Sequence, residues 1–438
     1  MTDRSDPETA TDGGLADGKF EEINWQDVDS AEYTRSLKSK LWAAVLGIWA
    51  LGLGANLFVR YVMADDLFHE IAGVSIPGVA ALDPTWIDTI PGLAVADGWI
   101  QFPVLGVVAL HDWLWSITLA GIAYYAVVPL YEKPRMRRYY WRQFRKNKAA
   151  VISGIFLLVI FLVGVVGSRV TDQPTEQAGL DSIPPVGISI DSFVVGPSGQ
   201  EVADCSGGTC TGTWEHPLGT TTSGEDILIS VIHGMEISMM VGLTATALST
   251  VIAATLALLA VYHGGWVDEI IFRWVDIQLT FPAFFLYLLI VYSIGGSLFI
   301  LIMIFGFIEW GGGARLMRSE ALQRREEPYV TASKAAGASP LWTMRRHLLP
   351  NISNTIITYV SLSIPSIILA EAALAFLGLG DATVTSWGQT ISDGRAELSR
   401  AWWISTIPGI FLFLTVLAFN FVGDALRDAI DPRHTGAE

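Results

Sequence analysis

Long apolar runs separated by short polar segments dominate the pattern of the chain. Eight of these runs are long enough to cross a hydrocarbon core of about 30 Å, for which a helix needs roughly 20 residues. They cover residues 41–62, 104–131, 149–170, 232–262, 271–294, 297–319, 352–377 and 404–424. The runs are too long and too continuous for the alternating strands of a β-barrel. The pattern therefore predicts an all-α, polytopic membrane protein.

Lysine and arginine are distributed unevenly between the polar segments, and this distribution predicts the orientation. Residues 132–148 hold eight of them and residues 315–346 hold seven. Residues 63–101 and 171–231 hold none, and together they carry fifteen Asp and Glu residues. Because short loops rich in Lys and Arg stay in the cytoplasm, we expect the first two segments inside and the last two outside. Both termini are then cytoplasmic, in a multi-pass protein of the cell membrane.

The 438 residues are 51% hydrophobic and 16% charged, and their formal net charge is −16. Such an acidic chain has no basic patch for a nucleic acid. The first 32 residues carry ten Asp and Glu against Arg4 and Lys19, which predicts a disordered tail over residues 1–40. Adaptation to high salt and an acidic docking tail both account for it. No cleavable signal is expected, because the first apolar run begins at Leu41 and has full length.

The two cysteines, Cys205 and Cys210, stand in the sequence CSGGTC within the external segment. On the oxidising side of a membrane, with flexible glycines between them, they favour a local disulfide; two free thiols are the alternative. Closing so short a loop would stabilise the fold by about 2 kcal/mol in the chain-entropy model. A metal site is not indicated, because His216 is the nearest histidine and no His pair has ligand spacing.

Motifs of catalysis and nucleotide binding are missing from the sequence. The seven histidines are scattered, and there is no His-Glu-x-x-His, no Gly-x-Ser-x-Gly and no phosphate loop of the form Gly-x-x-x-x-Gly-Lys-Ser/Thr. The segment WGGGAR at 310–315 lacks the lysine and lies in an apolar run, so its glycines indicate helix packing or flexing. We expect no enzyme activity, bound cofactor or metal in this chain.

The polar stretch YVTASKAAGASPLWTMRRHLLPN at 329–351 predicts two short helices folded at a glycine. The first should begin near Pro328, because proline favours the first helical position. Its Ala332, Ala335 and Ala336 present a face without bulky side chains. Gly337 is expected to end it in a left-handed conformation, which glycine adopts at low cost.

The second helix should start with Ser339 as its N-cap and Pro340 as its first residue. Pro350 bars its continuation, and Asn351 is expected to cap the next span. The two helices would project from the cytoplasmic face as a knob with a flat alanine face. Such a shape suits a socket on a partner protein.

This stretch resembles the cytoplasmic signature of permease subunits of ATP-binding-cassette importers, in the dipeptide and oligopeptide class. The family's signature is a Glu-Ala-Ala followed by a glycine and ending in Leu-Pro-Asn. The matching residues are Tyr329, Val330, Ala332, Gly337, Ala338, Ser339, His347, Leu349, Pro350 and Asn351. Thr331 stands where the Glu is usual and Ser333 where the second Ala is usual. Contacts owed to the carboxylate are thereby lost, whereas the glycine hinge is kept.

Further segments resemble the same family between about residue 140 and residue 433. They are WRQFRKNKAAV, HPLGTTTSGEDILISVIHG at 216–234, GGWVDEIIFRWVDIQLTFP at 264–282, FLGLG with the following SWG, and IPGIFLFLTVLAFNFVGDALRDAIDPR at 407–433. So many matches in one order are not expected by chance. Residues 1 to about 135 lie outside the resemblance.

The resemblance implies a six-span importer permease core with two extra N-terminal transmembrane helices. The domains would be an acidic tail at 1–40, two additional spans with an external loop at 41–131, a basic cytoplasmic linker at 132–148, the permease domain at 149–433 and a tail at 434–438. Within the permease domain, residues 171–231 would form an external loop and residues 320–351 the ATPase-coupling segment.

The resemblance also implies several partner proteins, in addition to the lipid of the membrane. These are a homologous second permease, two cytoplasmic ATPases that bind ATP and magnesium, and an external substrate-binding protein. Dipeptides or oligopeptides are the expected cargo, with nickel chelates and oligosaccharides as alternatives in the same class. An ion-driven secondary transporter and a membrane anchor without transport are rival functions. The importer is favoured, because the sequence has no convincing internal repeat of the kind found in secondary transporters and a membrane anchor would leave the knob unexplained.

Two residues in the spans are candidates for the transport path. Glu371 is costly to hold in lipid, so it should face a water path or make a buried structural hydrogen bond. Pro282 is expected to kink its span, as a hinge or as fixed shape. The charged residues of 268–276 before it have helical spacing, which suggests an interfacial helix with Glu269 paired to Arg273.

On the outer face, Glu225 and Glu236 stand where the family commonly has arginines. This reversal of charge would favour a cationic substrate or a different face of the binding protein. Adaptation to high salt accounts for it equally well.

Overall fold

The computed structural model describes residues 37–58, 94–96, 99–102, 106–107 and 109–430. The chain divides into two compact units, residues 1–51 and 52–438. The described part of the first unit is the beginning of helix α2, Leu37–Phe58. Residues 1–36 of the predicted acidic tail, most of the first external loop and the C-terminal tail lie outside the described residues, whereas residues 37–40, which were predicted to belong to the tail, form the start of α2.

The second unit is built mainly from helices, with two small antiparallel sheets. The first sheet consists of β1 (Ala94–Ala96), β2 (Trp99–Phe102) and β3 (Gly106–Val107). The helices up to the second sheet are α4 (Leu110–Ile122), η3 (Ala123–Val127), α5 (Val128–Glu132), α6 (Pro134–Phe144), α7 (Lys148–Leu162), η4 (Val163–Gly167) and α8 (Ser168–Val170). The remaining elements follow after residue 188.

They begin with β4 (Ser189–Asp191), η5 (Ser192–Val194), α9 (Gly199–Val202), β5 (Asp204–Ser206) and β6 (Thr209–Thr211). Then come α10 (Ile227–His263), α11 (Gly265–Thr280), α12 (Ala283–Ile294), α13 (Leu298–Ile308), α14 (Trp310–Arg325), α15 (Pro328–Ala335), α16 (Pro340–Thr343), η6 (Met344–Leu348) and α17 (Leu349–Asn351). The last are α18 (Ser353–Phe376), α19 (Trp387–Asp393), η7 (Arg395–Glu397) and α20 (Trp403–Ile430).

Six helices in the described part of the chain are long and apolar enough to cross a membrane. They are Leu110–Glu132, Lys148–Val170, Ile227–His263, Leu298–Arg325, Ser353–Phe376 and Trp403–Ile430. Helices α11 and α12, bent by 83° where they join, give a seventh if they count as one span. These positions match the apolar runs from 104–131 onward, and an all-α polytopic membrane protein is confirmed.

The two additional N-terminal spans stay a prediction. Helix α2 coincides with most of the run at 41–62, but it is not among the helices that pass as membrane spans. Residues 59–93, which would connect it to the next span, lie outside the described residues.

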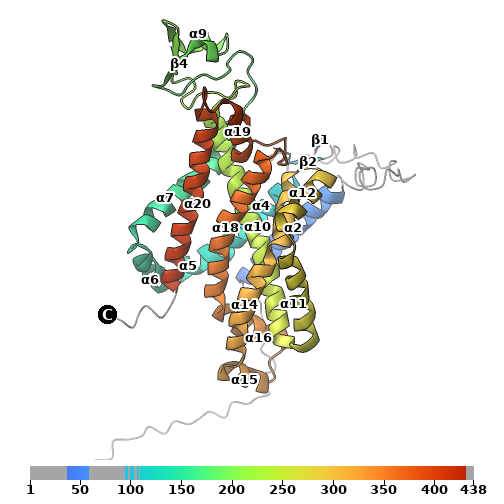
Figure 1. The fold of residues 1–438 in the computed structure, drawn as a ribbon. Helices are drawn as coiled ribbons and strands as arrows, with labels where there is room; N and C mark the ends of the chain where they lie inside the picture. The colour runs from blue at the N-terminus through green and yellow to red at the C-terminus, as the bar shows by residue number, and fades with distance from the viewer. Residues whose placement is uncertain (1–36, 59–93, 97–98, 103–105, 108, 431–438) are drawn as a thin grey trace, which may run out of the picture. The chain divides into compact units, whose positions relative to one another are not determined.

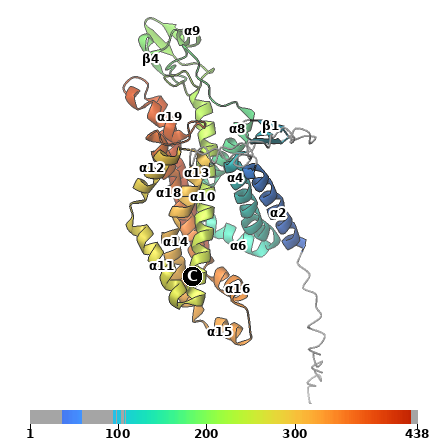
Figure 2. The ribbon, with the colours of Figure 1, turned by 90° about the vertical axis from the view of Figure 1, so that its right-hand side faces the viewer.

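Helix α10 lies in the middle of the bundle and packs against α13, α14 and α18 (Figures 1 and 2). Its 37 residues span about 55 Å at 1.5 Å per residue, more than a hydrocarbon core of about 30 Å. Close packing depends on its glycines: a Cβ on Gly234 would lie 2.3 Å from the ring of Trp387. That indole donates a hydrogen bond of 3.1 Å to the carbonyl of Val231.

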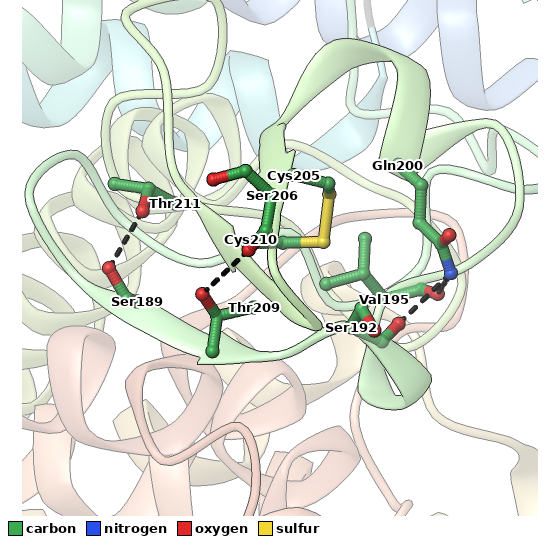
Figure 3. Close-up of a disulfide and its surroundings, with 9 residues drawn as sticks. All are labelled: Ser189, Ser192, Val195, Gln200, Cys205, Ser206, Thr209, Cys210 and Thr211. Carbon is green, nitrogen blue, oxygen red and sulfur yellow. Dashed lines mark hydrogen bonds between the residues drawn. A yellow bond between two sulfur atoms is a disulfide. The ribbon is translucent and has the colours of Figure 1, made fainter.

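A small domain lies outside the bundle, between α8 and α10. Its sheet has the antiparallel order β4-β6-β5, and its core consists of Ile183, Val195, Ala203 and Cys210. Cys205 and Cys210 face each other across β5 and β6 and form a disulfide (Figure 3). Cys210 is fully buried, so this disulfide is part of the domain core.

This small domain and the helices α15 and α16 lie at opposite ends of the second unit (Figures 1 and 2). Helix α10 connects the two ends: it begins directly after the domain, and its last turn reaches the vicinity of α15. The external segment predicted at 171–231 and the coupling segment predicted at 320–351 therefore lie at opposite ends of the bundle.

Candidate functional site

The knob, residues 328–351, is the first candidate site. Pro328 is the first residue of α15, as predicted. The helix ends where Gly337 adopts a φ of +82°, a left-handed conformation that favours glycine. The N–H of Ala338 donates to the carbonyl of Ser333 at 3.1 Å, and the N–H of Gly337 donates to that of Lys334 at 3.0 Å. These two bonds form a Schellman cap, which closes α15 and turns the chain toward α16.

The second half of the knob starts as predicted and ends differently. Ser339 is the N-cap of α16, with its hydroxyl accepting from the N–H of Trp342, and Pro340 is the first residue. The helix continues through a π-helical turn and through Pro350 to Asn351, so the prediction that Pro350 bars its continuation is wrong. Pro350 lies in the first turn of α17, where a proline is tolerated. The prediction that Asn351 caps the next span is wrong: its side-chain amide donates to the carbonyl of His347 at 2.6 Å. The amide thus bonds to the preceding turn of its own helix, and the N-cap position of α18 is Ile352.

The two helices enclose an open groove of about 640 Å³. Small residues of α15 and the turn line one side, and aromatic rings line the other. The ring of His347 lies 5.0 Å from that of Trp342 and 5.8 Å from that of Tyr329, measured between centroids. The lining residues are Tyr329, Ala332, Ser333, Ala336, Gly337, Ala338, Ser339, Trp342 and His347. Most residues that carry the family resemblance are therefore brought together at one surface.

The inner side of the knob is anchored to the bundle. Val330 and Leu348 are fully buried in a cluster that includes residues of α10 and α14. The ammonium group of Lys334 lies 5.0 Å from the ring centroid of Tyr262, in the last turn of α10. Next to it, the guanidinium of Arg325 donates to the carbonyl of Val261 at 2.8 Å. The knob thus contacts the end of α10 by packing and through Lys334, and Arg325 joins the end of α14 to the same turn of α10.

The outer side of the knob is exposed and basic. Arg345 and Arg346 are both exposed. Thr331, which stands in place of the family's usual Glu, is exposed as well. Ser333 lines the groove, and its buried hydroxyl has no hydrogen-bond partner among the described residues.

Pro282 lies at the 83° bend between α11 and α12, where it is the residue before the first turn of α12. A proline at this position ends the preceding helix, as the sequence predicts. The side chains of Glu269 and Arg273 approach to 3.6 Å on the exposed face of α11, as predicted.

The other two charged residues of α11 do not belong to an isolated interfacial helix. Asp268 pairs with Arg318, and Asp276 pairs with Arg315 at 2.6 Å. Both arginines belong to α14. Sequence reasoning missed these pairs because the partners are 39 and 50 residues away.

Glu371 is buried in α18, with 2% of its surface exposed. One oxygen of its carboxylate has no hydrogen-bond partner in the described part of the chain. The backbone of the neighbouring Ala372 contacts α19 so closely that a Cβ on Gly388 would lie 2.2 Å from its carbonyl oxygen. Glu371 therefore faces protein rather than lipid, and its role in a transport path stays a prediction.

The two outer glutamates have different environments. Glu236 is buried in α10 and pairs at 2.9 Å with Arg169 of α8, a partner that sequence reasoning missed. Glu225 precedes α10 and is half-buried. Burial raises the pKa of its carboxyl, and the nearby charges of Asp393 and Glu176 raise it further.

Residues 229–436, a range that includes the knob, match the family model of the binding-protein-dependent transport system inner membrane component. Residues 136–185 match the N-terminal transmembrane domain of oligopeptide transport permease C. A relative in Escherichia coli (strain K12), the oligopeptide transport system permease protein OppC, is 33% identical over 296 residues, covering 67% of this chain and 89% of the relative.

The chain belongs to the family of binding-protein-dependent transport permeases. The OppC permease of Haemophilus influenzae is 36% identical over 219 residues, which are 50% of this chain and 70% of that protein. The dipeptide transport system permease protein DppC of Bacillus subtilis is 32% identical over 297 residues, which are 67% of this chain and 84% of that protein. The expected family is confirmed, and residues 1–135 precede both matched regions.

Proposed function

We propose that this permease, together with a second permease, forms the translocation path of an ATP-driven importer of dipeptides or oligopeptides. An external binding protein delivers the peptide, and two cytoplasmic ATPases bind ATP and magnesium. The family and its OppC and DppC members, which are oligopeptide and dipeptide permeases, support peptides over nickel chelates and oligosaccharides. They also support an importer subunit over an ion-driven transporter.

The knob is the observation that carries this proposal. A groove lined by small residues and three aromatic side chains is exposed, while the opposite side of the same segment is buried against α10 and α14. This arrangement suits a segment whose exposed groove binds an ATPase on the cytoplasmic side while its buried side stays packed on the membrane helices. Closure of the ATPase pair around ATP would then shift the spans between inward-open and outward-open packings.

The orientation is part of the proposal. The knob and the basic segment 132–148 would lie in the cytoplasm with both termini, and the disulfide-bonded domain would lie outside. The opposite placement of the knob and this domain supports it (Figure 1).

Reconstitution into proteoliposomes tests the function. The permease pair, the two ATPases and the binding protein are incorporated, and uptake of a radiolabelled tripeptide is followed with and without ATP. We expect uptake that requires ATP, the ATPases and the binding protein together. Uptake driven by an ion gradient without the ATPases would overturn the proposal. Nickel chelates and an oligosaccharide serve as competing substrates.

A further inference from the structure

The membrane span Leu298–Arg325 is interrupted by a short break, and side chains of other helices donate hydrogen bonds to this break. Helix α13 ends at Ile308 and α14 begins at Trp310, with Glu309 between them. The side-chain amide of Gln278 donates to the carbonyl of Ile308, and the hydroxyl of Tyr359 lies 2.9 Å from the carbonyl of Glu309. Both carbonyls at the break are thus bound by side chains from α11 and α18.

The carboxylate of Glu309 has a third partner. The hydroxyl of Tyr287, on α12, donates to its Oε1 atom. The ring of Tyr287 is 3% exposed and meets Phe305 edge to face at 5.0 Å, so packing fixes its direction. Sequence reasoning missed Glu309, although an acidic residue directly before WGGGAR in an apolar run is a visible signal.

The glycines after the break make room for these donors. A Cβ on Gly311 would lie 2.7 Å from the side-chain oxygen of Gln278, and one on Gly313 would lie 2.7 Å from the ring of Tyr359. A Cβ on Gly312, between them, would meet nothing within 4 Å. The glycines of WGGGAR were predicted to serve helix packing. Two of them, Gly311 and Gly313, leave room for the side chains that bind the break.

Gln278 and Tyr287 lie on opposite sides of the 83° bend at Pro282. One point, the break at Glu309, therefore binds both arms of the bend. We infer that Glu309 is a positioning residue, which holds α11 and α12 at their angle through its carboxylate and the adjacent carbonyl of Ile308. Under the proposed transport function, on which this second step rests, a change of the bend between packings requires these bonds to break.

The inference is tested by a distance measurement that needs no transport activity. Spin labels are placed at the exposed positions Ile270→Cys on α11 and Leu289→Cys on α12 in the purified full-length permease. The native cysteines are joined in a disulfide and do not take the label. Pulsed electron paramagnetic resonance then gives the distribution of distances across the bend. We expect one population in the labelled parent.

Removing the donors should destroy this single population. The double variant Gln278→Leu with Tyr287→Phe is expected to show a broad distribution or a second distance. Glu309→Gln keeps an acceptor for Tyr287 and should retain the parent distribution. Tyr292→Phe is the matched control, because Tyr292 is on the same helix and is 86% exposed.

An unchanged distribution in the double variant would overturn the inference, as would an equal change in Tyr292→Phe. If the double variant does not fold, Tyr287→Phe alone removes one hydroxyl without changing the ring, and the same criterion applies to it. A failure of ATP-driven uptake in the reconstituted importer leaves this measurement intact, so the two proposals fail separately.

Discussion

His216 and Asp226 form a buried ion pair at the N-terminal end of α10. One carboxylate oxygen of Asp226 lies 2.8 Å from Nδ1 of His216. The other accepts the N–H groups of Leu228 and Ile229 at 2.7 and 3.2 Å, and so caps the helix. A single carboxylate therefore connects the segment before α10 to the first turn of that helix.

This pair predicts a pH dependence. The hydrogen bond to Asp226 raises the pKa of His216, burial opposes it, and the charges of Asp226 and Glu215 raise it again. A group with a raised pKa contributes stability that is complete below its unfolded pKa, about 6.5, and is lost as pH rises through the folded pKa. We expect hydrogen exchange at the start of α10 to show less protection as the pH rises above about 6.5.

The variant His216→Gln is the control for this effect. Its amide can donate to Asp226 at every pH, so the protection of the same amides should not vary over that range beyond the intrinsic exchange rate. Equal pH profiles in the parent and the variant would contradict the prediction.

Gly337 is predicted to control coupling through its backbone conformation. A Cβ there would meet nothing within 4 Å, so the cost of substitution comes from the φ of +82° alone. Left-handed backbone costs an L-residue roughly 1–2 kcal/mol, with β-branched residues strained most and Asn tolerated. We expect Gly337→Val to tilt α16 and raise the ATP hydrolysed per peptide taken up, whereas Gly337→Asn behaves like the parent.

Hydrolysis and uptake are measured together in the same proteoliposomes. A parent-like ratio in Gly337→Val would remove the hinge from the account. An equal loss in both variants would assign the effect to the added side chain rather than to the conformation.

Two neighbouring glycines of α14 should respond in opposite directions. Gly313→Ala places a methyl group 2.7 Å from the ring of Tyr359 and is expected to destabilise the protein by about 1–3 kcal/mol. Gly312→Ala enters open space in a helix and should stabilise it by roughly 0.5–1 kcal/mol. Thermal unfolding of the purified permease in detergent measures both, and the same sign for both would refute the packing assigned to the break.

The features that sequence could predict depend on local chemistry. Apolar runs placed the spans, because hydrocarbon requires length and continuity. Pro328, Gly337, Ser339 and Pro340 placed the turn of the knob, because each acts on its own backbone or within one turn. The prediction for Asn351 was wrong although it was also local: the side-chain amide donates back to the carbonyl of His347, whereas a cap would require the side-chain oxygen to accept from an N–H at the start of α18.

The features that sequence could not predict depend on contacts between distant segments. Glu236 looked like an unexplained charge reversal until the fold placed Arg169 beside it, 67 residues away. The 83° angle at Pro282 is similar, because a proline predicts a break but not its direction. The donors around Glu309 come from three different helices, and no local pattern connects them.

The central claim is that the knob faces the cytoplasm and is held there by an ATPase. The most direct measurement is labelling of Ala332→Cys, an exposed position in the groove, with a membrane-impermeant maleimide. We expect no labelling in intact cells, labelling in inside-out vesicles stripped of peripheral proteins, and protection when the ATPases are added back. Labelling from the outside of intact cells, or equal labelling with and without the ATPases, would contradict it.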